Sequence, residues 1–81
     1  MPEEIQKRFG EIHTTPMGID RIKRNLALTC PDDAVVDWCK RRITAPDASF
    51  TQKGKNWYVT SSNAVFTLNK YSMTVITAKR S

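Results

Sequence analysis

The spacing of apolar side chains in the first half of the chain is typical of amphipathic helices. Apolar residues recur there at intervals of three and four, the period at which side chains share one helix face. Pro2, followed by two glutamates, predicts a first helix start, and Gly10 keeps that helix short. The run Thr14-Thr15-Pro16 predicts a second start, because a hydroxyl caps a helix and proline fits its first position. The stripes are Ile5, Phe9 and Ile12 in the first helix and Ile19, Ile22 and Leu26 in the second.

A third helix is predicted between Pro31 and Ile43. The acids Asp32-Asp33 lie at its start and the basic triplet Lys40-Arg41-Arg42 at its end, which suits the helix dipole at both ends. This placement explains the triplet structurally, and a contact between the triplet and a ligand stays open beside it. The apolar stripe is Val35, Val36, Cys39 and Ile43, with Trp38 on a neighbouring edge.

After residue 47 the pattern changes from helical spacing to alternation. Strand-like runs cover residues 48–52, 56–60, 64–69 and 72–78, with short polar turns between them. Short turns force neighbouring strands to be antiparallel. The sequence therefore predicts an α+β fold in which two or three N-terminal helices pack on one face of a four-stranded antiparallel β-meander. We expect a single small domain over residues 1–81.

Alternation within the strand-like runs assigns side chains to two faces. Trp57 and Val59 point one way and Tyr58 points the other. Because Val59 is apolar, we expect Trp57 in the core and Tyr58 on the outer face, where Thr67, Asn69 and Thr74 join it. In the last run we expect uninterrupted alternation, with Met73, Val75 and Thr77 on one face and Thr74, Ile76 and Ala78 on the other.

A basic turn precedes these aromatic residues. Lys53-Gly54-Lys55 is predicted as a three-residue hairpin turn with Lys55 exposed. A turn with two cations beside an exposed aromatic strand is typical of surfaces that hold a phosphate chain and stack bases. The same residues also suit a solvated turn and a core tryptophan, so both interpretations stay open.

The net charge of +5 is unevenly distributed along the chain. Residues 1–43 hold eight Lys and Arg against seven Asp and Glu, a net of +1, whereas residues 44–81 hold five against one, a net of +4. The predicted sheet therefore carries most of the excess charge. Such a concentration favours a polyanionic partner, either RNA or an acidic protein surface.

We expect a cytoplasmic protein without a membrane contact. The first residues are acidic and unlike a signal peptide, and no apolar run approaches the roughly 18 residues of a membrane span. Cys30 and Cys39 are about eight residues apart across a predicted helix start, roughly 12 Å, which is too far for a disulfide. Free thiols of this kind are typical of a reducing compartment.

The sequence contains no motif for metal or nucleotide chemistry. It has no glycine-rich phosphate loop, paired-carboxylate signature or nucleophile elbow, and its single His and two Cys make no zinc set. We therefore expect neither a metal ion nor another cofactor. The remaining polar residues suit metal-independent work on phosphodiesters, namely His13, Arg21, Arg24, Lys55, Tyr58, Tyr71, Thr74, Thr77 and Lys79.

Candidate catalytic residues are His13, Arg24 and Lys55. Metal-free cleavage of RNA needs an acid–base group and cations for the developing charge, and a histidine side chain ordinarily titrates near neutrality. His13 would be the general acid or base, and Arg24 and Lys55 would stabilise the charge. An isolated histidine is also common at helix ends without any catalytic role, so whether the protein is an enzyme stays open. The candidate RNA-binding residues are Arg21, Lys23, Lys53, Tyr58, Thr74 and Lys79.

Four blocks of the sequence form a wider pattern: His13-Thr14-Thr15, residues 18–26, residues 54–59 and Ile76-Thr77-Ala78. Together they resemble a small bacterial family known only as a domain of unknown function, and the resemblance spans residues 11–79. It implies a compact, cytosolic, bacterial or phage-borne protein and brings no activity with it. Met73 and Lys79 stand where such relatives are expected to have an aromatic residue and often histidine, which speaks against catalysis from the last strand.

Helices followed by a four-stranded antiparallel sheet that ends in a Thr-Ala strand also resemble, at the level of the fold, the barnase-colicin-RelE group of ribonuclease toxins. In that group the sheet carries cationic and hydroxyl residues against RNA. The resemblance implies a metal-independent endoribonuclease of toxin type.

Three classes of function stay open. The first is an RNA-directed protein, and the ribonuclease is its enzymatic form. The second is a protein-binding module, such as a phage-encoded inhibitor that presents its basic sheet to an acidic host protein. The third is a structural or regulatory domain without a polyanionic partner. The charge distribution favours the first two over the third, we prefer the first of them, and the oligomeric state is not indicated.

Overall fold

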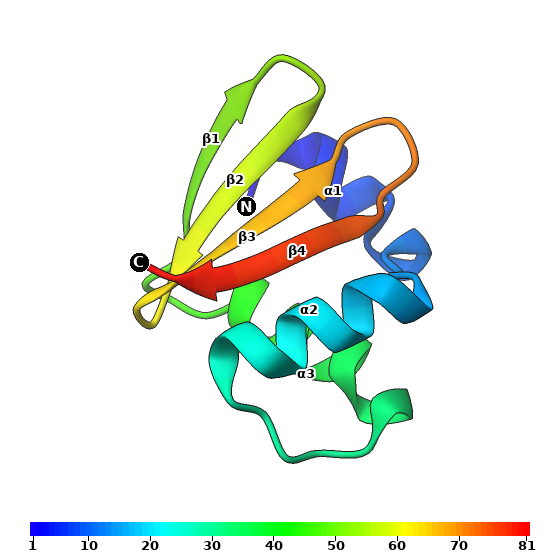
Figure 1. Cartoon of the computed structure of the whole chain (residues 1–81). Helices are drawn as coiled ribbons and strands as arrows, with labels where there is room; N and C mark the ends of the chain where they lie inside the picture. The colour runs from blue at the N-terminus through cyan, green and yellow to red at the C-terminus, as the bar shows by residue number, and fades with distance from the viewer.

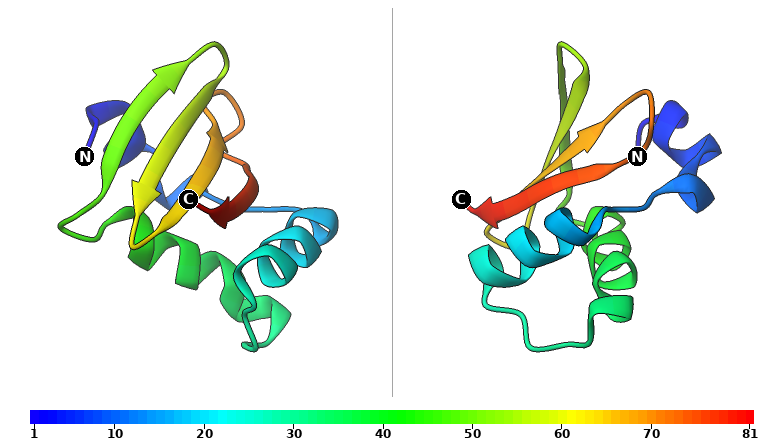
Figure 2. Two further views of the ribbon diagram at one scale, coloured as in Figure 1. Left: turned by 60° about the vertical axis from the view of Figure 1, so that its left-hand side comes forward. Right: turned by 45° about the vertical axis from the view of Figure 1, so that its right-hand side comes forward.

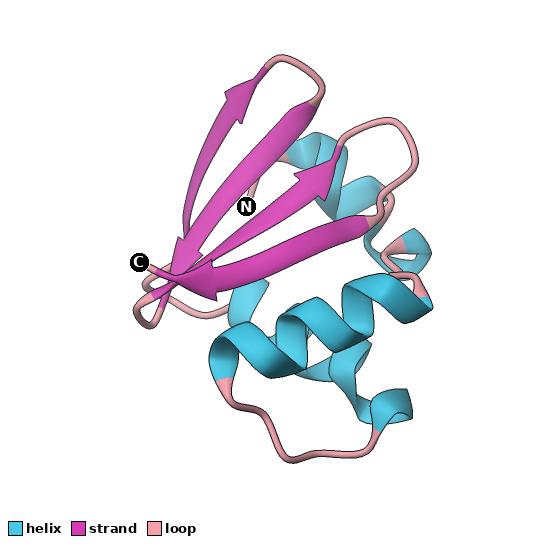
Figure 3. Ribbon diagram, in the orientation of Figure 1, coloured by secondary structure: helices cyan, strands magenta, loops and turns pink.

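The chain folds into three α-helices followed by a four-stranded antiparallel sheet (Figures 1 and 3). The computed structural model describes all residues from 1 to 81. The elements are α1 (Glu3–Lys7), a 3₁₀ helix (Phe9–Glu11), α2 (Pro16–Leu26), a second 3₁₀ helix (Asp32–Ala34), α3 (Val35–Ile43), β1 (Ser49–Lys53), β2 (Asn56–Ser61), β3 (Ala64–Asn69) and β4 (Val75–Arg80). The predicted α+β fold with a β-meander is confirmed.

Capping residues explain where helix α2 begins and ends. The Thr15 hydroxyl accepts a hydrogen bond from Gly18 N at 3.0 Å, and Pro16 occupies the first helical position. The helix ends at Ala27, whose left-handed backbone (φ 53°) closes the last turn. Gly18 is close to the Thr14 hydroxyl, and a Cβ at this position would collide with it. The predicted helix start at residues 14–16 is therefore confirmed.

The first α-helix is short, as predicted, and the third begins later than predicted. Helix α1 stops at Lys7, and the chain continues as a 3₁₀ turn that contains Gly10. Helix α3 begins at Val35, because Asp32–Ala34 form a 3₁₀ turn before it. Ile5 and Ile12 are buried as the apolar spacing predicted.

Two tight turns set the register of the first three strands. Gly54 has a φ of +61° at the first position of a two-residue turn, as a type II′ hairpin requires. Ser62 and Asn63 both have positive φ (50° and 66°), as in a type I′ turn. The predicted first turn was one residue too long, because Gly54 supports the two-residue geometry. Lys53 consequently belongs to β1 and pairs with Asn56.

The fourth strand begins at Val75, three residues later than predicted. Asn69 Oδ1 accepts hydrogen bonds from Tyr71 N at 2.9 Å and from Ser72 N at 3.0 Å. Met73 has a φ of 59°, which a regular strand does not allow. Side-chain hydrogen bonding from Asn69 therefore competes with the strand and turns this segment into a loop.

The predicted uninterrupted alternation in the last strand was wrong. The register between β3 and β4 shifts between Thr67 and Leu68, which pair with Thr77 and Val75 and leave one extra residue on β4. Because of this bulge, Val75 and Ala78 both face the core. Thr77 lies with Thr67 on the other face.

Helix α1 lies behind the sheet in Figure 1, α3 lies below the sheet and behind α2, and α2 runs along β4 (Figures 1 and 2). Asn25 Nδ2 donates to Ala78 O at 3.1 Å, and the Thr14 hydroxyl donates to Val75 O at 2.7 Å. These bonds satisfy carbonyl groups at the outer edge of β4. The core between helices and sheet contains Ile5, Ile12, Ile22, Val35, Cys39, Ile43, Val59, Ala64, Phe66, Leu68, Met73, Val75 and Ala78.

Both cysteines are free thiols, and Cys39 belongs to the core. Burial raises the pKa of Cys39 to about 12, so this thiol stays protonated and unreactive. None of the helices combines the length and the apolar character that a membrane crossing requires.

Candidate nucleic-acid interface

The sheet face opposite α1 and α3 is a surface of mostly polar side chains, which we call the open face. Its central row crosses all four strands, because each member is the direct cross-strand neighbour of the next. The central row is Thr51, Tyr58, Thr67 and Thr77. The rows on either side are Lys53, Asn56 and Asn69, and Ser49, Thr60, Val65 and Lys79.

Burial of the alternate residues explains why these side chains face outward. Val59, Phe66 and Leu68 are all 0% exposed on the helix side of the sheet. Their sequence neighbours Tyr58 and Thr67 must therefore project from the other side. The predicted outer position of Tyr58 is confirmed.

Trp57 shares the helix side with Val59, as predicted, but it is only half-buried. It packs against the edge of the core at the end of the sheet where the β1–β2 hairpin extends past the helices (Figure 1). Trp57 is therefore on the core side, as predicted, and packs at the margin of the core rather than within it.

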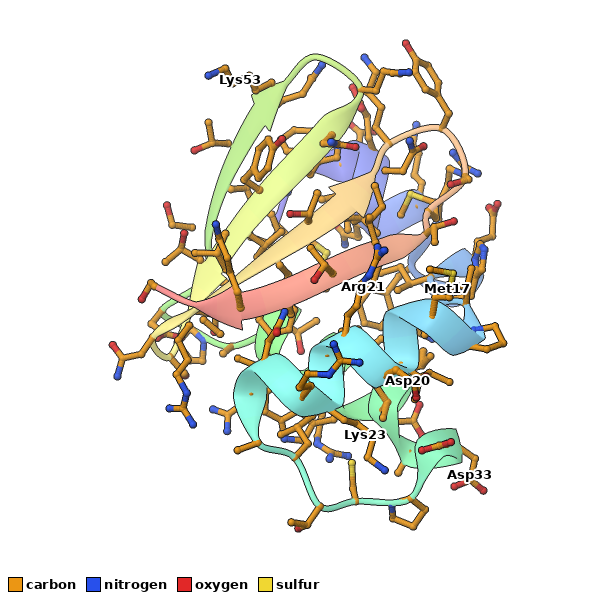
Figure 4. The ribbon with its side chains drawn as sticks, in the orientation of Figure 1. Met17, Asp20, Arg21, Lys23, Asp33 and Lys53 are labelled. Carbon is orange, nitrogen blue, oxygen red and sulfur yellow. The ribbon has the colours of Figure 1, made fainter.

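Unpaired cations lie around the hydroxyl row of the open face. Arg21 extends from α2 across β4, and Lys53 lies at the far end of β1 (Figure 4). Lys79 flanks the row on β4. None of these three cations belongs to an ion pair within the protein. The sequence from residue 48 onward holds five Lys and Arg and no Asp or Glu, so the strands supply no carboxylate to oppose an anion.

Tyr58 keeps a free hydroxyl proton in this arrangement. Asn56 Nδ2 donates to Tyr58 Oη at 3.4 Å, which is a long hydrogen bond. The phenol oxygen acts as the acceptor there, so its own proton is available for a ligand. Asn56 Oδ1 is buried without a partner, an uncommon condition for an amide oxygen.

His13 is built into the backbone at the start of the last strand. It pairs with Thr74 in a short parallel bridge, in which His13 N donates to Met73 O at 3.1 Å and Val75 N donates to His13 O at 2.7 Å. The ring is fixed as well, because Nδ1 lies 2.8 Å from Glu11 O and Nε2 lies 3.1 Å from Thr74 Oγ1. A carbonyl oxygen only accepts, so Nδ1 carries a proton.

Hydroxyl groups extend the histidine contact into a chain. Thr74 Oγ1 lies 2.7 Å from Ser72 Oγ, which lies 3.3 Å from Asn69 Oδ1. With a neutral imidazole, Ser72 donates to Thr74 and Thr74 donates to Nε2. With a protonated imidazole, Nε2 donates to Thr74, Thr74 donates to Ser72, and Ser72 donates to Asn69 Oδ1. His13 is hydrogen-bonded at both nitrogens in either state.

The other two predicted catalytic residues lie apart from this chain. Arg24 is exposed on α2, and Lys55 is exposed in the β1–β2 turn as predicted. Neither side chain has a hydrogen bond or an ion pair with His13, whose ring bonds only Glu11 and Thr74. The backbone of Lys55 is anchored instead, since its carbonyl accepts from Lys70 N at 2.8 Å.

The predicted RNA-binding residues divide between two surfaces. Arg21, Lys53, Tyr58 and Lys79 gather at the open face. Lys23 lies on the other side of α2, where it donates to Asp32 at 2.9 Å and where that carboxylate raises its pKa (Figure 4). Thr74 is occupied by His13 and Ser72.

The sequence did not predict that Thr51 lies on the open face or that Ser72 contacts Thr74. Thr51 faces outward only in the register of a two-residue turn, and the positive φ of Gly54 was the available signal. Ser72 had been assigned to a strand, and its contact with Thr74 depends on the loop that Asn69 stabilises.

The carboxylates of Glu11 and Asp47 make local hydrogen bonds that stabilise the fold, and the acidic residues do not form a cluster. Glu11 accepts from Arg8 at 2.9 Å, and this hydrogen bond lowers the pKa of Glu11. Asp47 accepts from Ser62 N at 2.8 Å and from the Ser61 hydroxyl at 3.0 Å, and these bonds lower the pKa of Asp47. No three His, Cys, Asp or Glu side chains come together as a metal site would require.

The fold and this surface define a small α+β protein with an open, cationic sheet face. Residues 6–79 match a family described as “Protein of unknown function (DUF3781)”, and the chain belongs to this family. Comparisons with curated proteins and with solved structures gave no match. The predicted membership of a domain family of unknown function is confirmed, and the likeness to ribonuclease toxins stays a prediction.

Proposed function

We propose that the protein binds single-stranded RNA across its open face. The observation that carries this proposal is the hydroxyl row flanked by Arg21, Lys53 and Lys79, none of them ion-paired, on a sheet whose strands hold no carboxylate. Cations without internal partners are free to neutralise phosphates. The result is a surface with donors for an anion and no competing charge.

Each part of the open face suits a different part of RNA. Tyr58 offers an aromatic ring for stacking, and the threonine hydroxyls offer donors and acceptors to bases, phosphates and 2′-hydroxyls. Three inter-strand spacings make the central row about 14 Å long. An open four-stranded sheet of this kind has room for two or three splayed nucleotides.

Binding has stronger support than cleavage. His13 makes its ring contacts with Glu11 and Thr74, and no contact brings Arg24 or Lys55 to it. A general base needs its proton acceptor within reach of the substrate, and here Thr74 occupies Nε2 when the ring is neutral. We therefore place His13 in a structural hydrogen-bond chain and assign RNA contact to the open face.

Salt dependence of RNA affinity is the test. Fluorescence anisotropy of a labelled single-stranded oligonucleotide, repeated over a salt series, gives the slope of log K against log salt. Arg21→Ala, Lys53→Ala and Lys79→Ala should each reduce this slope by about 0.7, the value for one single-strand phosphate. Arg41→Ala removes an exposed cation from α3 and should leave both slope and affinity unchanged.

Tyr58 separates RNA binding from simple charge attraction. Tyr58→Ala should lower RNA affinity by about 5- to 150-fold, the range that stacking of one base represents, whereas Tyr58→Phe should keep most of it. An acidic polypeptide of equal charge, measured in parallel, should bind more weakly and ignore Tyr58→Ala. If Tyr58→Ala lowers the affinity for RNA and for the acidic polypeptide equally, or if the salt slope for RNA is near zero, an acidic protein is favoured as the partner.

Cleavage is measured on the same samples. RNA incubated with EDTA is examined for shortened products with cyclic phosphate ends. We expect intact RNA with wild-type protein and unchanged affinity with His13→Ala. Metal-independent products that disappear in His13→Ala would establish the ribonuclease instead.

A further inference from the structure

A second site is suggested by a hollow at the corner where the β2–β3 turn, the ends of α2 and α3, and the end of β4 meet (Figure 1). It encloses about 170 Å³. Its apolar floor is Leu26, Trp38 and Ala64, and its polar lining is Arg42, Ser61, Ser62, Asn63 and Arg80. The open face does not include any of these residues, so this corner pocket is a distinct feature.

The charged groups in the corner pocket are both guanidinium groups. Arg42 and Arg80 line it, no carboxylate does, and neither arginine has an ion pair or a side-chain hydrogen bond within the protein. The Arg42 guanidinium lies 4.9 Å from the centre of the Trp38 ring, which positions it without using its N–H donors. Two sets of unused, directional donors therefore line one small cavity.

The other hollows of the molecule differ in this respect. Two adjoining hollows of about 250 and 280 Å³ beside Trp57 include Glu4 as well as Lys7. Lys7 is paired with Glu3 there, and Arg8 is paired with Glu11. Because a carboxylate lies among the cations there, including Lys70, and two of these cations are already paired, these hollows give no clear preference for an anion, and the corner pocket is the better candidate.

We propose that the corner pocket binds a phosphate monoester group. Two guanidinium groups match the double charge and the several oxygens of such a group, and guanidinium bonds phosphate through paired N–H donors. The Asn63 amide provides a further donor at the lining. The Asp47 carboxylate, which accepts hydrogen bonds from Ser61 and Ser62, is not part of the lining.

The turn at the pocket is attached to its neighbours by hydrogen bonds. Asp47 accepts from Ser62 N at 2.8 Å, and Asn63 O accepts from Ser81 N at 2.9 Å. These bonds attach the β2–β3 turn to the loop before β1 and to the end of β4. Preorganised donors lose little freedom when an anion binds.

A phosphate monoester comes from one of two sources, a free phosphate compound or the terminal phosphate of a nucleic acid. Arg80 pairs with Ala64, directly beside the pair of Lys79 with Val65 on the open face. The pocket therefore begins one residue along β4 from the open face, so an RNA strand that leaves the open face past Lys79 would come near it. The pocket itself does not depend on RNA binding, so the two proposals fail separately.

Inorganic phosphate is the first probe. In ¹⁵N-resolved NMR spectra of the whole chain, we expect saturable shifts of the Asn63 side-chain amide and of the Arg42 and Arg80 Nε–H signals. Arg42→Gln and Arg80→Gln should each weaken phosphate binding by about tenfold, the effect of losing a charge-assisted contact. Arg41→Gln, which changes charge by the same amount outside the pocket, should leave binding unchanged.

Oligonucleotides with and without a 5′-phosphate distinguish the sources. A preference for the phosphorylated form that disappears in the Arg42→Gln, Arg80→Gln double variant identifies the terminal phosphate of RNA as ligand. Inorganic phosphate shifts with no such preference identify a free phosphate compound. Circular dichroism confirms that the variants are folded. The proposal is overturned if phosphate moves none of these signals and the oligonucleotides bind alike, or if Arg41→Gln weakens binding as much as the pocket variants.

Discussion

The two faces of the sheet are made by the same strands and differ in almost every property. On β3, Ala64, Phe66 and Leu68 are at most 5% exposed and pack against helices. Their neighbours Val65 and Thr67 are half-buried on the open face. Stability thus depends on one set of alternate residues and the proposed RNA binding on the other, so adjacent substitutions should affect one without the other.

The largest effect is expected from Phe66→Ala. Phe66 is 0% exposed and its ring lies 6.0 Å from that of Trp38, so the substitution leaves a cavity and should lower the free energy of unfolding by about 3–5 kcal/mol. Thr67→Ala, one residue further on the open face, should change it by about 0.5 kcal/mol or less. Urea denaturation measures the free energy of unfolding of both variants. If Phe66→Ala does not fold, Phe66→Leu is measured in its place. Equal losses at the two positions would abolish the distinction between the faces.

Trp57→Ala and Tyr58→Ala should give opposite results. Because Trp57 is half-buried, its removal should lower the free energy of unfolding by about 2 kcal/mol, less than for a fully buried ring. The folded variant should bind RNA normally. Tyr58→Ala should stay nearly as stable as wild type and lose RNA affinity. If Trp57→Ala is stable and loses RNA affinity, the two faces have been assigned the wrong way round.

The β1–β2 turn tests the register that creates the open face. Gly54 has a φ of +61° with open space around it, so Gly54→Ala should lower the free energy of unfolding by about 1 kcal/mol through backbone strain alone. Lys55→Ala, at the next and exposed position, should change it by less than about 0.5 kcal/mol. Thermal unfolding of the two variants is sufficient. A harmless Gly54→Ala would show that the turn tolerates another geometry.

The smallest effect is expected at Asp47, which binds Ser61, the buried polar residue on the covered side of the sheet. Hydrogen bonds from Ser62 and Ser61 lower the pKa of Asp47, so the unfolded chain takes up a proton more readily than the folded one. Its contribution is complete above the usual carboxyl pKa of 3.8 and is lost as pH falls below that value.

In the Asp47→Asn variant, the free energy of unfolding should therefore fall less steeply with decreasing pH than in the wild type. Urea denaturation from about pH 5 downward measures this. Asp33→Asn is the matched control, since Asp33 is exposed and has no hydrogen bond or ion pair. A curve unchanged by Asp47→Asn, or flattened equally by Asp33→Asn, would contradict this role.

Local signals in the sequence were sufficient to predict the fold and about half of the residues that form the open face. Thr15-Pro16 marks a helix start without any tertiary contact, and alternation around Val59 assigns Tyr58 to the outside. The bulge on β4 was beyond such reasoning, because it arises from pairing with β3 and from the loop that Asn69 stabilises.

Contacts between distant residues could not be foreseen in the same way. His13 pairs with Thr74, sixty-one residues away in the sequence, and no periodicity reports this. Arg42 and Arg80 meet at the corner pocket only because α3 and β4 end at the same place. Residue type and charge predict a polyanionic ligand, which stays a prediction, and only the fold shows where the groups come together.

The hydrogen bonds from Asn25 and Thr14 to β4 have a consequence for assembly. They close one side of the sheet, so a foreign strand finds no free carbonyls at Ala78 or Val75. Growth of the sheet is thereby limited to β1, which pairs only with β2. That remaining edge is five residues long and ends in Lys53, two features that disfavour strand addition. The protein is thus protected against polymerising through its own sheet while the open face stays accessible.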